Sequence, residues 1–140
     1  MSLIFLLDTN IVSEPMRPNP NRKTMAYLQQ HEGEVAIASV VWHELLFGWQ
    51  RLPKSAKSDA IGAYLMEVIA AEIPILSYDA QAAYWHANER ARLTAAGRTP
   101  SFADGQIAAV ATINDLTLVT ANVSDYASFE GLQIENWTDG

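Results

Sequence analysis

The sequence predicts an α/β fold with a mostly parallel central sheet of four to five strands. Short continuous apolar runs recur along the chain, and each is typical of a strand buried on both faces. The longer segments between these runs carry apolar residues at the spacing of an amphipathic helix. Strands that alternate with helices form a parallel sheet covered by those helices. The length of 140 residues fits one domain, residues 1–140.

The apolar runs predict strands at residues 3–7, 35–38, 73–76 and 116–119, with a last strand at 132–137. Pro74 stands at the start of the third run, where a strand tolerates proline. Helical spacing predicts helices at residues 21–32, 39–51, 59–72, 79–96 and 101–114, and a short helix that starts at Asn122. The predicted N-caps are Asn21, Ser39 and Ser101, and the predicted C-cap is Gly97.

The composition excludes several classes of protein. The chain has no cysteine, which rules out a disulfide framework, a thiolate zinc site, an iron–sulfur cluster and a thiol nucleophile. No apolar run approaches the roughly 18 residues that a membrane span needs. The apolar start of the chain meets Asp8 at once and lacks the basic flank of a signal peptide. We therefore expect a soluble, cytoplasmic protein without a membrane partner.

The formal net charge is −7, which speaks against a bulk electrostatic grip on nucleic acid. The basic residues form three small groups: Arg17, Arg22 and Lys23; Arg51, Lys54 and Lys57; and Arg90, Arg92 and Arg98. Each group is either a solvated face or a set of local phosphate contacts around an acidic centre.

Five polar residues are predicted to meet at one edge of the sheet: Asp8, Glu44, Asp104, Asn122 and Asp125. They follow strands or open helices, and in this topology the carboxyl ends of strands and the N-termini of helices share an edge. Ligands bind at that edge in open α/β sheets. Carboxylates that converge there repel one another unless their pKa values rise or a divalent cation lies between them. Oxygen ligands without cysteine or histidine favour Mg²⁺ or Mn²⁺ over Zn²⁺.

Helix capping is the alternative explanation for these acids. Asp8 can be an N-cap, and Asp104 and Asp125 each stand three residues after a predicted cap. Glu44 lies beyond the first helical turn, where a cap is not needed. Capping therefore explains single residues but not the shared edge.

Other signatures fail. His43-Glu44 is half of a zinc-protease motif, but Phe47 replaces the second histidine. The three histidines, His31, His43 and His86, lie in separate segments and are expected at the surface or the core edge.

Four motifs in order resemble one family. They are Asp8-Thr-Asn-Ile-Val-Ser-Glu14, Glu44-Leu-Leu-Phe-Gly48, Asp104-Gly-Gln-Ile-Ala-Ala109 and Leu118-Val-Thr-Ala-Asn-Val-Ser-Asp-Tyr126. Together they resemble the PIN-domain ribonucleases, in particular the VapC toxins of VapBC toxin–antitoxin pairs and their FitB-like branch. The resemblance covers nearly the whole chain and implies a PIN-like α/β/α sandwich.

The resemblance implies roles for particular residues. Asp8, Glu44 and Asp104 would bind the metal, and Asp125 would be the fourth catalytic acid and ligand, with Asn122 beside it. Thr9, Thr120 and Asn122 would support these ligands, and Gly48 would pack closely beside the site or serve as an ordinary packing glycine. Arg90, Arg92 and Arg98 are candidates for holding RNA phosphates.

The implied activity is hydrolysis of RNA phosphodiester bonds with Mg²⁺ or Mn²⁺, in tRNA or ribosomal RNA. An activated water would attack in line and leave 3′-hydroxyl and 5′-phosphate ends. The implied partners are a VapB-like antitoxin, a second copy of the chain in a homodimer, and promoter DNA through the antitoxin complex alone.

Two other functions stay open at this point. A catalytically silent PIN-like module would bind a partner or regulate its own promoter without cleaving RNA. A phosphatase-like hydrolase would use Asp8 as a nucleophile, although the second aspartate usual in such enzymes is Asn10 here.

Overall fold

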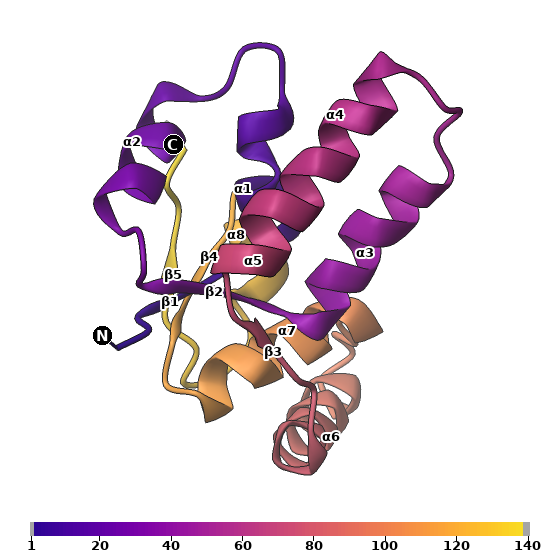
Figure 1. Cartoon of the computed structure of the whole chain (residues 1–140). Coiled ribbons are helices and arrows are strands. Elements are labelled where there is room, and N and C mark those ends of the chain that lie inside the picture. The colour runs from indigo at the N-terminus through magenta and orange to yellow at the C-terminus, as the bar shows by residue number, and fades with distance from the viewer. Residues whose placement is uncertain (1, 139–140) are drawn as a thin grey trace.

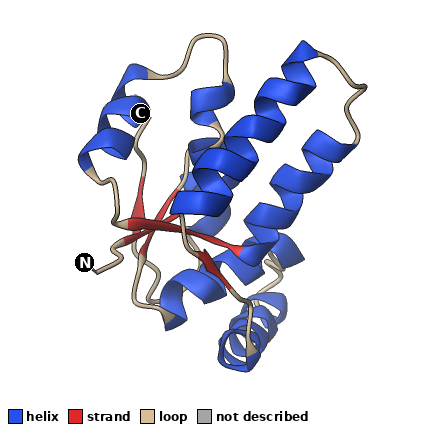
Figure 2. Cartoon of the chain, viewed as in Figure 1, coloured by secondary structure: helices blue, strands red, loops and turns tan. Residues whose placement is uncertain are grey.

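The computed structural model describes residues 2–138 and shows one five-stranded sheet flanked by helices (Figures 1 and 2). The strands are β1 (Phe5–Leu7), β2 (Val35–Ala38), β3 (Ile75–Leu76), β4 (Thr117–Val119) and β5 (Ile134–Glu135). Their order in the sheet is β3-β2-β1-β4-β5, and every neighbouring pair is parallel. The predicted fold class is confirmed. Asp139, one of the acids near the C-terminus, lies outside the described residues.

The helices are α1 (Thr9–Val12), α2 (Arg22–Gln30), α3 (Ser39–Gln50), α4 (Ala56–Tyr64), α5 (Ala70–Glu72), α6 (Ala80–Ala95), α7 (Phe102–Ile113) and α8 (Val123–Tyr126). A 3-10 turn, η1 (Glu14–Met16), follows α1, and a π-helical turn, η2 (Leu65–Ile69), joins α4 to α5. In Figure 1, α2 and the α4–α5 run lie above the sheet, and α7 and α6 lie below it. Helix α7 contacts β2, β4 and α6, and it buries six of its twelve residues.

Local capping explains where most helices begin. The side chains of Asn21, Asp79 and Ser101 accept backbone N–H groups of α2, α6 and α7, and Gly97 takes a positive φ of 75° just after α6. The prediction for Ser39 is wrong, because β2 runs directly into α3 and extended Ala38 is the cap residue, without a side-chain bond.

Two other expectations need correction. The helix predicted at 59–72 begins at Ala56, because its N-cap Ser55 forms a reciprocal capping box with Ser58 in its first turn. His86 is not at the surface or the core edge: it is buried at 2% exposure, where its ring fills the space above Gly105 in α7. Among the described residues, no helix combines the length and the apolar character needed to cross a membrane.

Candidate active site

Asp8 directly follows β1 and caps α1. Its Oδ1 accepts the backbone N–H of Thr9 at 2.8 Å, and its Oδ2 accepts the hydroxyl of Thr120 at 2.8 Å. Thr120 directly follows β4, the neighbour of β1 in the sheet, and its side chain is buried. The two strands therefore hold Asp8, which is 7% exposed, in one orientation at the carboxyl edge of the sheet.

Asp104 lies in the first turn of α7, and its backbone N–H donates to the N-cap Ser101 at 3.1 Å. The hydroxyl of Tyr126 donates to Asp104 Oδ1 at 3.1 Å and also lies 3.5 Å from Asp8 Oδ2. A single buried tyrosine at the end of α8 thus joins the carboxylates of β1 and α7.

Glu44 lies on the exposed side of α3, and its Oε1 accepts the hydroxyl of Thr9 at 2.9 Å. Thr9 therefore connects two acids, because its backbone N–H binds Asp8 and its hydroxyl binds Glu44. The geometry brings three of the four predicted acids into one bonded network with the predicted supporting residues Thr9 and Thr120.

These acids line a cavity of about 390 Å³. Its lining also includes Asn10, Ser13, Arg17 and Asn122. Asp125 is not among the lining residues, and its side chain is exposed one helical turn further on in α8. Asn122 has no side-chain capping bond, so the structure gives no support to a capping box from Asn122 to Asp125.

Burial and neighbouring charge raise the pKa of Asp8 above its ordinary value. Burial is the largest cause, and the charge of Asp104 acts in the same direction. The hydrogen bonds from Thr120, Thr9 and Tyr126 lower the pKa and offset part of the rise. Asp8 is thus a buried carboxylate beside a second acid, an arrangement typical of functional sites.

Comparisons with known proteins show to which family a chain with this site belongs. The family model described as PIN domain matches residues 5–126. The chain belongs to the PIN-domain family. This PIN domain is 30% identical to toxin FitB of Neisseria gonorrhoeae over 139 residues, which are 97% of this chain and 100% of the relative. It is also 30% identical over 136 residues to the tRNA(fMet)-specific endonuclease VapC of Shigella flexneri, with 97% of this chain and 99% of the relative covered. The solved structure of FitAB bound to an IR36 DNA fragment superposes with a TM-score of 0.89 at 28% identity, and 98% of each chain is covered.

The donor set of this PIN domain fits a hard divalent cation. The described residues contain no group of three or more His, Cys, Asp or Glu side chains arranged to hold a metal ion together. The site is instead organised around the pair Asp8 and Asp104, with Glu44 attached through Thr9. Mg²⁺ suits such a pair, because it commonly takes one or two carboxylates and completes its coordination with water and substrate phosphate.

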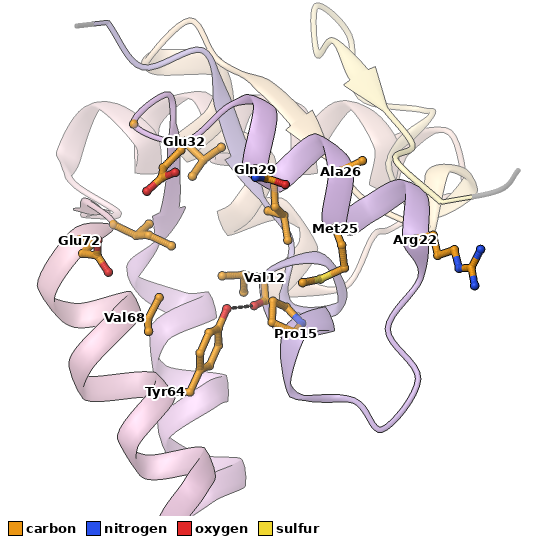
Figure 3. Close-up of a pocket in the computed structure, with 14 residues that line it drawn as sticks. Val12, Pro15, Arg22, Met25, Ala26, Gln29, Glu32, Tyr64, Val68 and Glu72 are labelled. Atoms are coloured by element: carbon orange, nitrogen blue, oxygen red, sulfur yellow. Dashed lines mark hydrogen bonds between the residues drawn. The ribbon is translucent and has the colours of Figure 1, made fainter.

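A second, larger hollow of about 650 Å³ lies between α2 and the α4–α5 run. In Figure 3, Tyr64 and Val68 face Met25 and Gln29 across it, Glu32 and Glu72 lie towards one end, and Arg22 points away. The Tyr64 hydroxyl donates to the carbonyl of Val12 at 2.9 Å, which ties the wall of this groove to α1. We call this hollow the α2–α4 groove.

The arginines predicted to hold RNA differ in their surroundings. The guanidinium of Arg92 donates to both carboxylate oxygens of Glu89 and to the carbonyl of Ser128, so it braces α6 against the C-terminal segment. Arg90 lies over the ring of Phe102, next to cavity-lining Ala103. Arg98 is exposed beyond α6.

Sequence reasoning gave Tyr126 no role in the site, although this residue ends the fourth motif, and it left Arg17 open between a solvated face and a phosphate contact. Tyr126 reads as an ordinary apolar position of a short helix, and its contacts lie 22 and 118 residues away along the chain. The structure places Arg17 in the lining of the acidic cavity, which favours the second of the two interpretations. The expectation that Gly48 packs closely is wrong, because a Cβ there would meet nothing within 4 Å.

Proposed function

We propose that this PIN domain is a divalent-metal-dependent endoribonuclease that hydrolyses phosphodiester bonds of tRNA or ribosomal RNA and acts as the toxin of a toxin–antitoxin pair. The observation that carries the proposal is the buried Asp8, joined through Tyr126 to Asp104 in an acidic cavity. Two further findings support the proposal: the chain belongs to the PIN-domain family, and one of its relatives is named as an endonuclease.

The residues of the chain have separable roles in this reaction. When bound at Asp8 and Asp104, Mg²⁺ or Mn²⁺ supplies water activation and stabilisation of the leaving oxygen. Thr120 and the Thr9 N–H hold Asp8 in place, and the Thr9 hydroxyl holds Glu44 at the rim of the cavity. Asp125 stays a predicted ligand, and Asn122 is a polar neighbour that lines the cavity.

Phosphate binding is assigned first to Arg17, because a cation in the wall of an acidic cavity attracts the anionic backbone to the carboxylates. Arg90 is the second candidate, since it extends from α6 over the ring of Phe102, the first residue of α7 and the neighbour of cavity-lining Ala103 in sequence. Arg98 stays a predicted contact. Arg92 is the weakest of the predicted set, because Glu89 and Ser128 already occupy its guanidinium.

We assign the α2–α4 groove to a VapB- or FitA-like antitoxin. The related FitB chain is solved as a FitAB complex bound to DNA, which supports an antitoxin partner and DNA binding through that complex. The apolar walls of the groove suit an apolar segment, and Glu32 and Glu72 suit a basic residue at its end. We further propose a cytoplasmic homodimer, which light scattering of the purified protein would test.

The deciding experiment incubates purified protein with total tRNA and with ribosomal RNA, in Mg²⁺, in Mn²⁺ and in EDTA. Discrete cuts that require metal and disappear in Asp8→Asn and Asp104→Asn are expected. Asp115→Asn is the matched control, because it removes an exposed acid at a positive φ of 59°, a conformation that asparagine adopts readily. Folded wild-type protein that cuts no RNA would instead favour the silent binding module.

A further inference from the structure

We propose that the hydroxyl of Tyr126 is a positioning group that fixes the carboxylate of Asp104 relative to Asp8 and so sets the affinity of this pair for a divalent cation. The inference rests on the proposed metal site and deepens it. It assigns a function to the hydroxyl of Tyr126, the last residue of the fourth motif, to which the family resemblance gives no role.

The burial of Tyr126 leaves its hydroxyl few partners. The residue is 1% exposed, and its ring packs against Phe129 with a centroid distance of 6.3 Å. A phenylalanine would fill the same volume, so packing alone does not explain the polar atom. A buried hydroxyl requires a hydrogen-bond partner, and here the two nearest are carboxylate oxygens at 3.1 and 3.5 Å.

The two acids differ in how firmly they are held. Asp8 is fixed without Tyr126, because the Thr9 N–H and the Thr120 hydroxyl each donate to it at 2.8 Å. In the described part of the chain, Tyr126 is the only residue whose hydrogen bond reaches the Asp104 carboxylate. Without the hydroxyl, repulsion from Asp8 would be free to turn Asp104 away.

The Tyr126 hydroxyl can donate to only one of the two carboxylates at a time. It has one proton to donate, and the shorter distance directs that proton to Asp104.

The test compares wild-type protein with Tyr126→Phe, which removes the hydroxyl and keeps the ring. Mn²⁺ is titrated into each protein without RNA, and free Mn²⁺ is followed by electron paramagnetic resonance. We expect the dissociation constant to rise about 10- to 100-fold, the usual effect of removing a group that orients metal ligands. Cleavage by Tyr126→Phe should be lost at low Mn²⁺ and largely recover when Mn²⁺ is raised in proportion.

Tyr27→Phe is the matched control, because Tyr27 is a half-buried tyrosine that packs against Trp137. Its Mn²⁺ affinity should equal that of wild type. A purely structural role for the Tyr126 hydroxyl would lower the melting temperature without shifting the Mn²⁺ titration, and that result would overturn the proposal. If Tyr126→Phe fails to fold, difluorotyrosine at position 126 keeps the ring and the hydroxyl but changes its donor strength. An unchanged Mn²⁺ affinity would then overturn the proposal in the same way.

The outcomes separate this inference from the proposed function. Wild-type protein that binds Mn²⁺ and cleaves RNA, with equal affinity in Tyr126→Phe, overturns the positioning role and leaves the nuclease intact. Wild-type protein that binds no Mn²⁺ overturns both.

Discussion

Asp8 combines two roles that a single substitution can separate. Asparagine caps a helix as well as aspartate does, but it cannot supply a carboxylate. We expect Asp8→Asn to reduce RNA cleavage by about two orders of magnitude or more, because charge stabilisation by a bound metal is worth several kcal/mol. The melting temperature at neutral pH should rise, since a buried negative charge is removed. Undiminished cleavage by Asp8→Asn would contradict the assignment of Asp8 to the active site.

The same residue predicts a pH dependence of stability. The pKa of Asp8 is raised in the folded protein, first by burial and also by the charge of Asp104. The folded state then holds this proton more tightly than the unfolded chain, so ionisation costs folding free energy. That cost grows as pH rises from about 4, the pKa of an unfolded aspartate, through the raised pKa, and is constant above it. Melting curves across this range should show that the difference in melting temperature between Asp8→Asn and wild type grows with pH and then becomes constant. A difference that shrinks as pH rises would contradict a raised pKa of Asp8.

Arg17 is the cation in the wall of the cavity, and its effect should appear in binding rather than in the chemical step. We expect Arg17→Gln to raise KM for RNA with little change in kcat. It should also lower the salt dependence of binding, by about one released counterion. Lys57→Gln, which removes the same charge from an exposed position in α4, should change neither. Equal effects of the two variants would show that only net charge matters.

At the scale of elements, the start of α7 depends on the contact between Gly105 and His86. A Cβ at position 105 would lie 2.1 Å from Nε2 of this buried histidine. Gly105→Ala must therefore push α7 away from α6 and shift Asp104, which is the preceding residue. We expect a loss of about 1–3 kcal/mol in the free energy of unfolding, the usual cost of overpacking, with weaker cleavage.

Gly48 is the matched glycine for this measurement, because a Cβ there meets nothing within 4 Å inside α3. Gly48→Ala should stabilise the protein by about 0.5–1 kcal/mol, since alanine loses less backbone entropy in a helix. Urea denaturation of both variants measures the difference. Destabilisation by Gly48→Ala would show instead that Gly48 packs closely against its surroundings, as the family resemblance implies.

The elements that sequence reasoning predicted well are those with local causes. Asn21 and Ser101 cap helices through bonds three residues long, and such bonds can be read from adjacent letters. The prediction that Ser39 is an N-cap was wrong, because β2 ends at Ala38 and α3 begins at the next residue, with no loop between them. The local sequence does not show that the loop is missing. Tyr126 was missed for the same kind of reason, as its partners come from two other elements.

At the scale of the whole molecule, the strand order brings together site residues that lie far apart in the sequence. The parallel order places the ends of β1 and β4 side by side, so Asp8 meets Thr120 across 112 residues of sequence. Alternating runs were enough to predict this edge and three of its acids, Asp8, Glu44 and Asp104, whereas the predicted Asp125 does not line the cavity. The α2–α4 groove could not be predicted, because it arises from helices that leave apolar side chains facing each other without contact.

The groove yields the last prediction, which concerns the partner. Val68 and Met66 both lie exposed in η2, at 38% and 44%, but only Val68 lines the groove. Val68→Glu would place a charge among Val12, Met25 and Tyr64 and should weaken antitoxin binding by about 100-fold, whereas Met66→Glu should bind normally. Calorimetric titration with a VapB- or FitA-like antitoxin measures both affinities. If Met66→Glu is the variant that loses binding, the antitoxin covers the other face of this helix, and the groove has another occupant.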